Sequence, residues 1–160
     1  MIFLTIGTQL PFDRLVNAVD FAAPLVSETI FGQVGNTKKM PANFKCMRFL
    51  PASEFEETFK AARVIIGHAG IGTVLSCIKC QKPLVAMARQ KFYGEHRNDH
   101  QLATVEQIRN IPGIYIVEDV DDVVNALCRV DLDYPIIQNT SSKKLLISNL
   151  KKEIAKSMTF

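Results

Sequence analysis

The sequence has no apolar run that approaches the roughly 20 residues of a membrane-spanning helix. Its apolar start at residues 2–6 is short and has no basic lead-in, so a secretory signal peptide is disfavoured. The net charge is also small, since the sequence has 19 Lys and Arg and 16 Asp and Glu, which gives a formal net charge of +3. That balance does not predict nucleic-acid binding. These absences favour a cytoplasmic protein over a membrane-spanning or secreted one.

Cysteine is sparse, with four residues among 160. Only Cys77 and Cys80 are close together, and we expect them inside a helix, whereas a redox pair lies at a helix start, where the dipole lowers the thiol pKa. A zinc site needs further ligands at paired spacing, and Cys46 and Cys128 stand alone. We therefore expect reduced thiols that pack against their neighbours.

The sequence does contain short apolar runs that alternate with segments of helical periodicity. The expected strands cover residues 2–6, 29–34, 44–50, 64–66, 84–87 and 114–117. The expected helices cover residues 11–24, 53–62, 73–80, 95–110 and 119–130, with a last helix at about 141–157. Ser53 and Glu56 are typical of a capping box at the start of the second helix. This order predicts one α/β domain over residues 1–160, with a doubly wound, Rossmann-like parallel sheet and helices on both faces.

The clearest motif is the glycine-rich stretch at residues 67–73, between an expected strand and an expected helix. Glycines let backbone amides approach a ligand, and the N–H groups at a helix start are unpaired and partly positive. Ligands of doubly wound sheets bind beyond the carboxyl ends of the strands, so the stretch predicts a diphosphate cradle. Thr73 adds a hydroxyl and His68 a side-chain donor. The dinucleotide fingerprint is incomplete and no Walker lysine follows, and a tight turn without a ligand is the alternative.

A dense polar cluster follows the expected strand at 84–87, at the same edge of the sheet. Amide and carboxylate side chains of this kind recognise sugar hydroxyls, and a capped helix start with a solvated face is the alternative. His96 and His100 are four residues apart, on one face of the expected helix. No Glu follows the first His, so we expect no metal site. The cluster comprises Arg89, Glu95, His96, Asn98, Asp99, His100 and Gln101.

Two more strand ends carry small or polar residues. Gly7 and Thr8 follow the first expected strand, and Gln33 and Gly35 close the second. Turns after strands are commonly rich in glycine, so each pair is a weak signal alone. Together they extend the predicted ligand site along the carboxyl edge of the sheet.

These stretches resemble the C-terminal domain of family 28 glycosyltransferases, the nucleotide-sugar-binding half of the GT-B fold. The likeness runs from residue 1 to about residue 110 and is greatest to small one-domain members. Such members include catalytic subunits of two-part UDP-N-acetylglucosamine transferases and subunits of bacterial exopolysaccharide glycosyltransferases. The matching stretches are Gly7-Thr8-Gln9 with Pro11-Phe12, Gln33-Val34-Gly35, Gly67-His68-Ala69-Gly70-Ile71-Gly72-Thr73, Lys82-Pro83-Leu84, and Glu95-His96 through Asp99-His100-Gln101.

The resemblance implies a subunit that transfers a hexose from a UDP-sugar. The residues implied to hold the diphosphate are Gly70, Gly72 and Thr73, with Ala69 and His68 beside them. Asp99 and Gln101 would contact sugar hydroxyls, and Gln33 would lie near the base or ribose. Ser76 stands where many relatives carry an acidic residue that binds the ribose, and its hydroxyl bonds more weakly than a carboxylate.

A helix N-terminus aimed at the diphosphate stabilises the charge of the leaving group, so we expect neither a metal nor a cofactor to be required. A general base must still deprotonate the acceptor hydroxyl. The candidates in this chain are Asp13, Glu95 and His96, and a base on another polypeptide is the alternative.

The resemblance also implies a partner, because a GT-B enzyme has two such domains. The partner would be a membrane-anchored subunit that binds a lipid-linked saccharide acceptor and recruits this chain to the membrane. The basic, amphipathic segment at 141–157 is a candidate contact, although it also suits packing on its own sheet. Self-association stays open. Two other functions also stay open. One is that of a non-catalytic nucleotide-sugar-binding subunit, and the other is that of an NADP-binding oxidoreductase-like domain in which Arg89 binds the 2′-phosphate.

Overall fold

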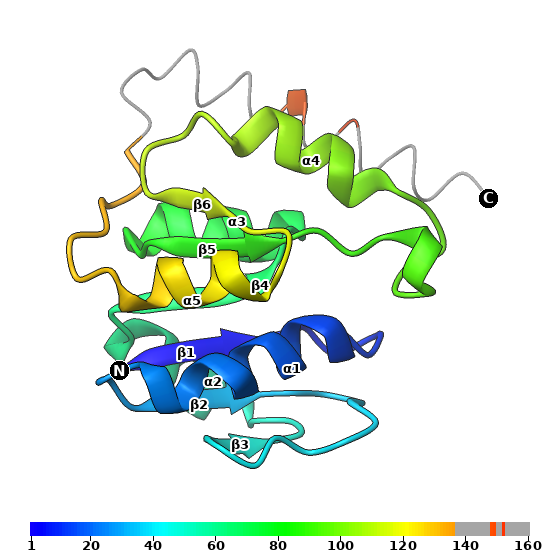
Figure 1. Ribbon diagram of the computed structural model, residues 1–160. Helices are drawn as coiled ribbons and strands as arrows, with labels where there is room; N and C mark the ends of the chain where they lie inside the picture. The colour runs from blue at the N-terminus through cyan, green and yellow to red at the C-terminus, as the bar shows by residue number, and fades with distance from the viewer. Residues whose placement is uncertain (137–147, 150–151, 153–160) are drawn as a thin grey trace.

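The computed structural model describes residues 1–136, 148–149 and 152. Within these residues six strands form one parallel sheet in the order β3-β2-β1-β4-β5-β6 (Figure 1). The order reverses between β1 and β4, which makes this point the topological switch of a doubly wound sheet. The strands are β1 (Ile2–Thr5), β2 (Ile30–Gln33), β3 (Lys45–Met47), β4 (Val64–His68), β5 (Leu84–Met87) and β6 (Ile114–Ile116).

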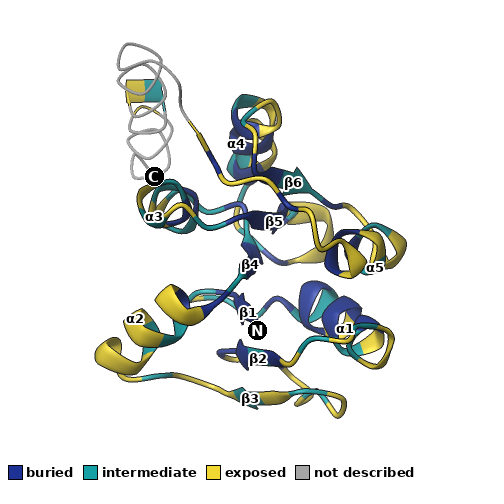
Figure 2. Ribbon diagram, turned by 90° about the vertical axis from the view of Figure 1, so that its left-hand side faces the viewer, coloured by how far each residue is buried: buried dark blue, intermediate teal, exposed yellow. Residues whose placement is uncertain are grey.

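Helices cover both faces of the sheet (Figure 2). Successive strand residues point to opposite faces, so Leu4 and Ile66 pack towards α1 and α5, whereas Phe3 and Ile65 pack towards α2, α3 and α4. The α-helices are α1 (Asp13–Ala22), α2 (Ala52–Ala61), α3 (Ile71–Cys80), α4 (His100–Ile108) and α5 (Val120–Cys128), and two 3₁₀ turns are η1 (Ala23–Leu25) and η2 (Lys91–Tyr93). The predicted α/β architecture is confirmed.

The central strands explain why the sequence shows continuous apolar runs rather than alternation. Every residue of β1 and β5 is buried, as are the first four residues of β4. Strands covered on both faces need apolar side chains at each position, which is the usual pattern of parallel sheets. This arrangement brings the ends of β1, β4 and β5 to one edge.

The capping-box prediction for α2 is wrong. The helix begins at Ala52, its N-cap is Pro51, and no side chain caps it. The N–H of Phe55 donates to the carbonyl of Pro51, so Ser53 lies inside the first turn. Pro51 lies just before the helix, where its missing N–H removes no intrahelical hydrogen bond, so the helix can begin earlier than Ser53.

The predicted helix at 95–110 is also wrong in its first part, because α4 begins only at His100. Gly94 has a φ of +67°, which interrupts any helix running from η2 into α4. As a result His96 and His100 do not share a helix face. The strand predicted at 44–50 is shorter as well, since β3 covers only Lys45–Met47.

The last predicted helix, at about 141–157, lies outside the described residues except for Ser148, Asn149 and Lys152. In the described ranges, no helix has the length and apolar character needed to cross a bilayer. All four cysteines are free thiols, as predicted, and burial raises the pKa of Cys77.

Candidate functional site

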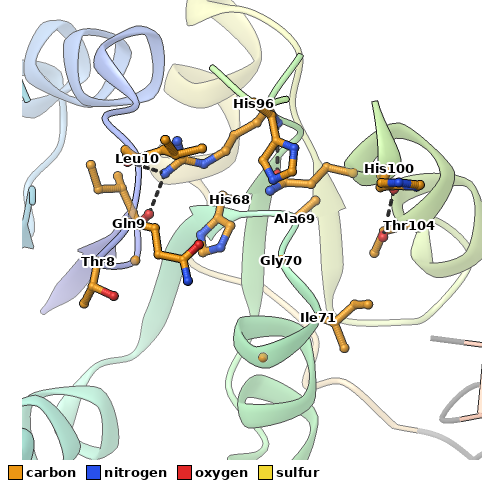
Figure 3. A pocket seen from close by; sticks show the side chains of 15 residues that line it. Thr8, Gln9, Leu10, His68, Ala69, Gly70, Ile71, His96, His100 and Thr104 are labelled. Carbon is orange, nitrogen blue, oxygen red and sulfur yellow. Dashed lines mark hydrogen bonds between the residues drawn. The ribbon is translucent and has the colours of Figure 1, made fainter. Parts of the chain in front are cut away.

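A cavity of about 480 Å³ lies beyond the carboxyl ends of β1, β4 and β5 (Figure 3). It is situated at the switch point between β1 and β4, where ligands of doubly wound sheets bind. Three segments line it: residues 6–10 after β1, residues 68–72 around the start of α3, and the chain after β5. The last segment contributes Arg89, His96, His100, Gln101 and Thr104. The predicted edge of the sheet is therefore hollowed at the predicted place.

The imidazole of His68 lies between the loop after β1 and the start of α3 (Figure 3). A Cβ atom on Gly70 would collide with Nε2 of this ring, and one on Gly7 would come within 3.2 Å of its Cε1. Gly7 also has a φ of +76°, a conformation that side chains rarely adopt. These two glycines are thus required by the fold as much as by any ligand.

His68 also has a buried ring nitrogen whose hydrogen bond the described part of the chain does not supply. Its Nδ1 is buried and has no hydrogen-bond partner among the described residues. Burial lowers the pKa of His68 to about 4, with further lowering from the charges of Arg89 and His96. The ring is therefore neutral at pH 7 and carries one N–H donor. A buried polar atom without a protein partner is normally satisfied by a ligand or water.

The start of α3 supplies backbone donors. The helix begins at Ile71, two residues before the predicted start, and its N-cap Gly70 offers no side chain. Its first-turn N–H groups therefore have neither intrahelical nor side-chain partners. Ile71 and Gly72 line the cavity, and nothing lies within 4 Å of a Cβ placed on Gly72. The structure thus has an open helix N-terminus at the predicted cradle.

Arg89 lines the cavity but is not available to bind a ligand directly. Its side chain is only 3% exposed, and it donates to backbone carbonyls of both loops. The acceptors are the oxygens of Pro11 at 2.6 Å, Ile6 at 2.7 Å, Leu10 at 2.8 Å and Glu95 at 3.3 Å. The four Nη N–H groups of Arg89 already bind the protein, so the predicted contact of Arg89 with substrate stays a prediction that these hydrogen bonds do not favour.

Gln101 has a fixed orientation at the cavity wall. Its Oε1 accepts from the N–H of Arg89 at 3.0 Å. Since a backbone N–H only donates, the side-chain oxygen must face it, and the NH₂ group is the part left for a ligand. Thr104 lies three residues along the same face of α4 and donates to the carbonyl of His100 at 3.1 Å.

Three predicted acidic residues do not line the cavity, because each carboxylate binds another part of the chain. Glu95 accepts from Nε and Nη2 of Arg14, both at 2.9 Å. Asp13 accepts from the hydroxyl of Thr37 at 2.5 Å and from the N–H of Lys38 at 2.8 Å. Asp99 accepts from the N–H of Lys91 at 2.8 Å. Each of these carboxylates holds its own segment against another part of the chain, so its presence in the sequence does not by itself indicate a ligand.

Four further predicted residues lie outside the cavity lining. Gln33 is buried and accepts from the N–H of Leu50 at 2.8 Å. Gly35 is buried beneath the loop after β1, close to the carbonyl of Gly7. Ser76 is exposed on α3. The methyl group of Thr73 faces Gly67 in β4.

Other lining residues were not predicted as site residues. Gln9 and Ile71 lie in the stretches that match the family, which was a signal for both. Leu10 extends the loop after Gly7 and Thr8, and its place next to them was its one signal. Thr104 could have been found from its spacing to Gln101, had α4 been given its true start.

Metal binding finds little support in the described ranges. There, no group of three or more His, Cys, Asp or Glu is placed to hold an ion. Two Asp-x-Asp triplets occur, at 119–121 and 131–133, but both lie away from the cavity lining. Asp119 instead caps α5 by accepting from the N–H of Asp122 at 2.9 Å. That the site needs no metal stays a prediction.

Curated relatives match part of this chain. Human UDP-N-acetylglucosamine transferase subunit ALG13 is 29% identical over 118 residues, which is 67% of this chain and 10% of that protein. The mouse protein of the same name is 29% identical over 117 residues, 66% of this chain and 10% of its own length. The chain thus spans about a tenth of the length of the curated relatives it matches.

Solved structures share the fold. The NMR solution structure of ALG13 has a TM-score of 0.62 at 16% identity and covers 94% of this chain and 96% of its own. The glycotransferase of kitacinnamycin has a TM-score of 0.61 at 16% identity, covering 97% of this chain and 39% of its own. The glycosyltransferase SsfS6 of Streptomyces sp. SF2575, complexed with thymidine diphosphate, has a TM-score of 0.56 at 20% identity and covers 97% and 37%.

The family model of the glycosyltransferase family 28 C-terminal domain matches residues 1–158, nearly the whole chain. The match agrees with the doubly wound sheet. The chain therefore belongs to the glycosyltransferase family 28 C-terminal domain family and has the fold of one half of a GT-B glycosyltransferase.

Proposed function

We propose that the chain is the donor-binding, catalytic half of a UDP-sugar-dependent glycosyltransferase. The observation that carries the proposal is the cavity at the switch point, where the start of α3 and His68 present donors together. Among the described residues that line it there is no Asp or Glu, and Arg89 is its one Lys or Arg. A wall with donors and positive charge and without carboxylates suits a diphosphate.

The transfer reaction fits these groups. The acceptor oxygen forms a bond to the anomeric carbon, the bond from that carbon to the diphosphate oxygen breaks, and UDP leaves with the electron pair. Negative charge grows on the diphosphate as the bond breaks. The N–H groups at the start of α3 and the neutral His68 stabilise that charge. The NH₂ group of Gln101 is placed to donate to a hydroxyl oxygen of the sugar.

The geometry reduces the number of candidates for the general base in this chain. Of the three candidates only His96 lines the cavity, whereas Asp13 and Glu95 are engaged elsewhere. The Nδ1 of His96 accepts from the N–H of Asn98 at 3.4 Å. We propose His96, or a group on the acceptor-binding partner, as the base that receives the acceptor proton.

The partner belongs to the proposal too. This chain corresponds to 39% and 37% of two larger glycosyltransferase structures, and the human and mouse relatives are named as subunits. We propose a membrane-anchored partner that binds a lipid-linked saccharide in polysaccharide or glycan biosynthesis. The chain would act at the cytoplasmic side, recruited peripherally through that partner.

Two alternatives make different predictions. A non-catalytic nucleotide-sugar-binding subunit would bind UDP, but transfer would survive changes in its cavity. An NADP-binding domain is disfavoured because the guanidinium of Arg89 is buried against carbonyls and cannot read a 2′-phosphate.

The first experiment measures binding by thermal shift and calorimetry with UDP, UDP-sugars and NADP. We expect UDP to raise the Tm and NADP to leave it unchanged. A rise with NADP alone would overturn the proposal. The second experiment reconstitutes transfer with the partner and compares His68→Gln with Asn110→Ala, an exposed control residue. Full transfer by His68→Gln would leave only the regulatory alternative.

A further inference from the structure

Arg89 is a buried cation without a carboxylate of its own. Among the described residues, each hydrogen bond of its guanidinium goes to a backbone carbonyl. The nearby carboxylate of Glu95 is bound at both oxygens by Arg14, and Arg89 contacts only the carbonyl of Glu95. The group formed by Arg14, Arg89 and Glu95 therefore keeps one net positive charge. A buried charge is costly unless something compensates it.

The carbonyls that Arg89 binds belong to two facing walls of the cavity. Ile6, Leu10 and Pro11 lie in the loop after β1, whereas Glu95 lies in the segment after β5. The guanidinium also stacks over the ring of Phe12, 4.7 Å from its centroid. Arg89 therefore holds the two walls at a fixed separation.

The charge of Arg89 is felt inside the cavity. Burial is the main cause of the low pKa of His68, and the charge of Arg89 is the next cause. Burial also lowers the pKa of Arg89 itself to about 10, although Glu95 partly opposes this shift, so Arg89 stays charged at pH 7. Charges buried in protein interact more strongly and are screened less by salt than charges in water.

We propose that Arg89 is a positioning residue whose uncompensated charge makes the cavity selective for a diphosphate that it does not touch. The bound diphosphate supplies the missing negative charge, and the carbonyl bonds keep the walls ready to receive it. This inference rests on the proposed function. It differs from the direct contact predicted from the sequence, because the interaction acts through space while the four Nη N–H groups remain bound to the protein.

Binding of uridine and UDP by three variants tests the inference, since these ligands differ only in the charged diphosphate. Arg89→Met removes the charge and the carbonyl bonds, and Arg89→Lys keeps the charge but loses most of the bonds. Arg97→Met is the matched control, because Arg97 is an exposed cation of the same segment. NMR titration measures the weak binding of uridine and also reports whether each variant is folded.

For Arg89→Met we expect the affinity for UDP to fall at least about tenfold more than that for uridine. Arg89→Lys should keep the ratio of the two affinities within about threefold of wild type, and Arg97→Met within about twofold. Equal losses for uridine and UDP in Arg89→Met would overturn the inference and leave Arg89 a purely structural role. If Arg89→Met does not fold, Arg89→Gln supplies the neutral variant with two N–H donors retained. If wild type binds no UDP, the proposed function fails and the inference fails with it.

Discussion

The glycine-rich turn at 67–72 and the polar segment at 88–101 border the same cavity, yet they use their polar groups differently. In the turn, Nδ1 of His68 and the start of α3 are left without partners in the described chain. In the segment, Glu95 and Asp99 bind other parts of the protein. The segment at 88–101 has more polar residues, yet its carboxylates are the groups less available to a ligand. A high density of polar residues can therefore indicate a loop stabilised by its own hydrogen bonds as well as a binding site.

The strongest test of this difference compares His68→Ala with Asp99→Ala. The family resemblance implies that both residues lie in the substrate site, whereas the structure separates them. Loss of the His68 donor should lower transfer by the reconstituted enzyme on the order of 100-fold, the usual effect of removing one such donor. Asp99→Ala should act only by loosening its loop, with a smaller loss. Equal losses in a steady-state assay would erase the distinction between the two regions.

The pH dependence of stability tests the state of His68 without any ligand. Its pKa is about 4 in the folded protein and near 6.5 in the unfolded chain. The unfolded state therefore binds more protons between these values, so stability falls as the pH decreases from about 6.5 to 4, by on the order of 3 kcal/mol. Urea unfolding of wild type and His68→Gln measures this contribution. An identical pH profile in both would show that His68 is not buried in its neutral form.

Glu95→Gln tests whether Glu95, in the polar segment, has a structural role rather than a contact with the ligand. It removes the charge that pairs with Arg14, whose side chain is 22% exposed. Because breaking a partly buried pair leaves one charge without its partner, we expect the free energy of unfolding to fall by about 2 kcal/mol. Because Glu95 offsets part of the positive charge beside the cavity, UDP affinity per folded molecule should stay the same or rise. A large loss of UDP affinity with unchanged stability would instead make Glu95 a ligand contact.

The smallest expected change in stability is that of Gly72→Ala. Nothing lies within 4 Å of the added Cβ, and alanine favours a helix by roughly 0.5–1 kcal/mol over glycine. The methyl group would nevertheless stand at the open start of α3, so UDP should bind more weakly to a protein of equal or higher Tm. Gly70→Ala is the contrasting variant, since its Cβ would collide with His68 and lower the Tm. Unchanged UDP binding in Gly72→Ala would place the diphosphate elsewhere.

The two regions also differ in how well the sequence predicted them. The position of the turn was predicted because its glycines, its preceding apolar strand and its following helix are all local signals. It is shorter than predicted, since β4 extends to His68 and α3 begins at Ile71. The start of α4 was missed because Gly94 adopts a positive φ and Glu95 is held by Arg14, 81 positions away. The side chains of Asp13 and Gln33 were predicted at the right sheet edge, but their hydrogen bonds turn them away from the cavity.

The sequence by itself determined the α/β fold, the family and the position of the glycine turn, because apolar periodicity, glycine and proline act over a few residues. Only the tertiary structure decided which polar groups remain available. That choice depends on hydrogen bonds between segments distant in sequence, such as the bond from Arg89 to the carbonyl of Ile6 across 83 positions. A donor or acceptor that finds a partner within the fold is no longer available to a ligand, and local patterns carry no information about that partner.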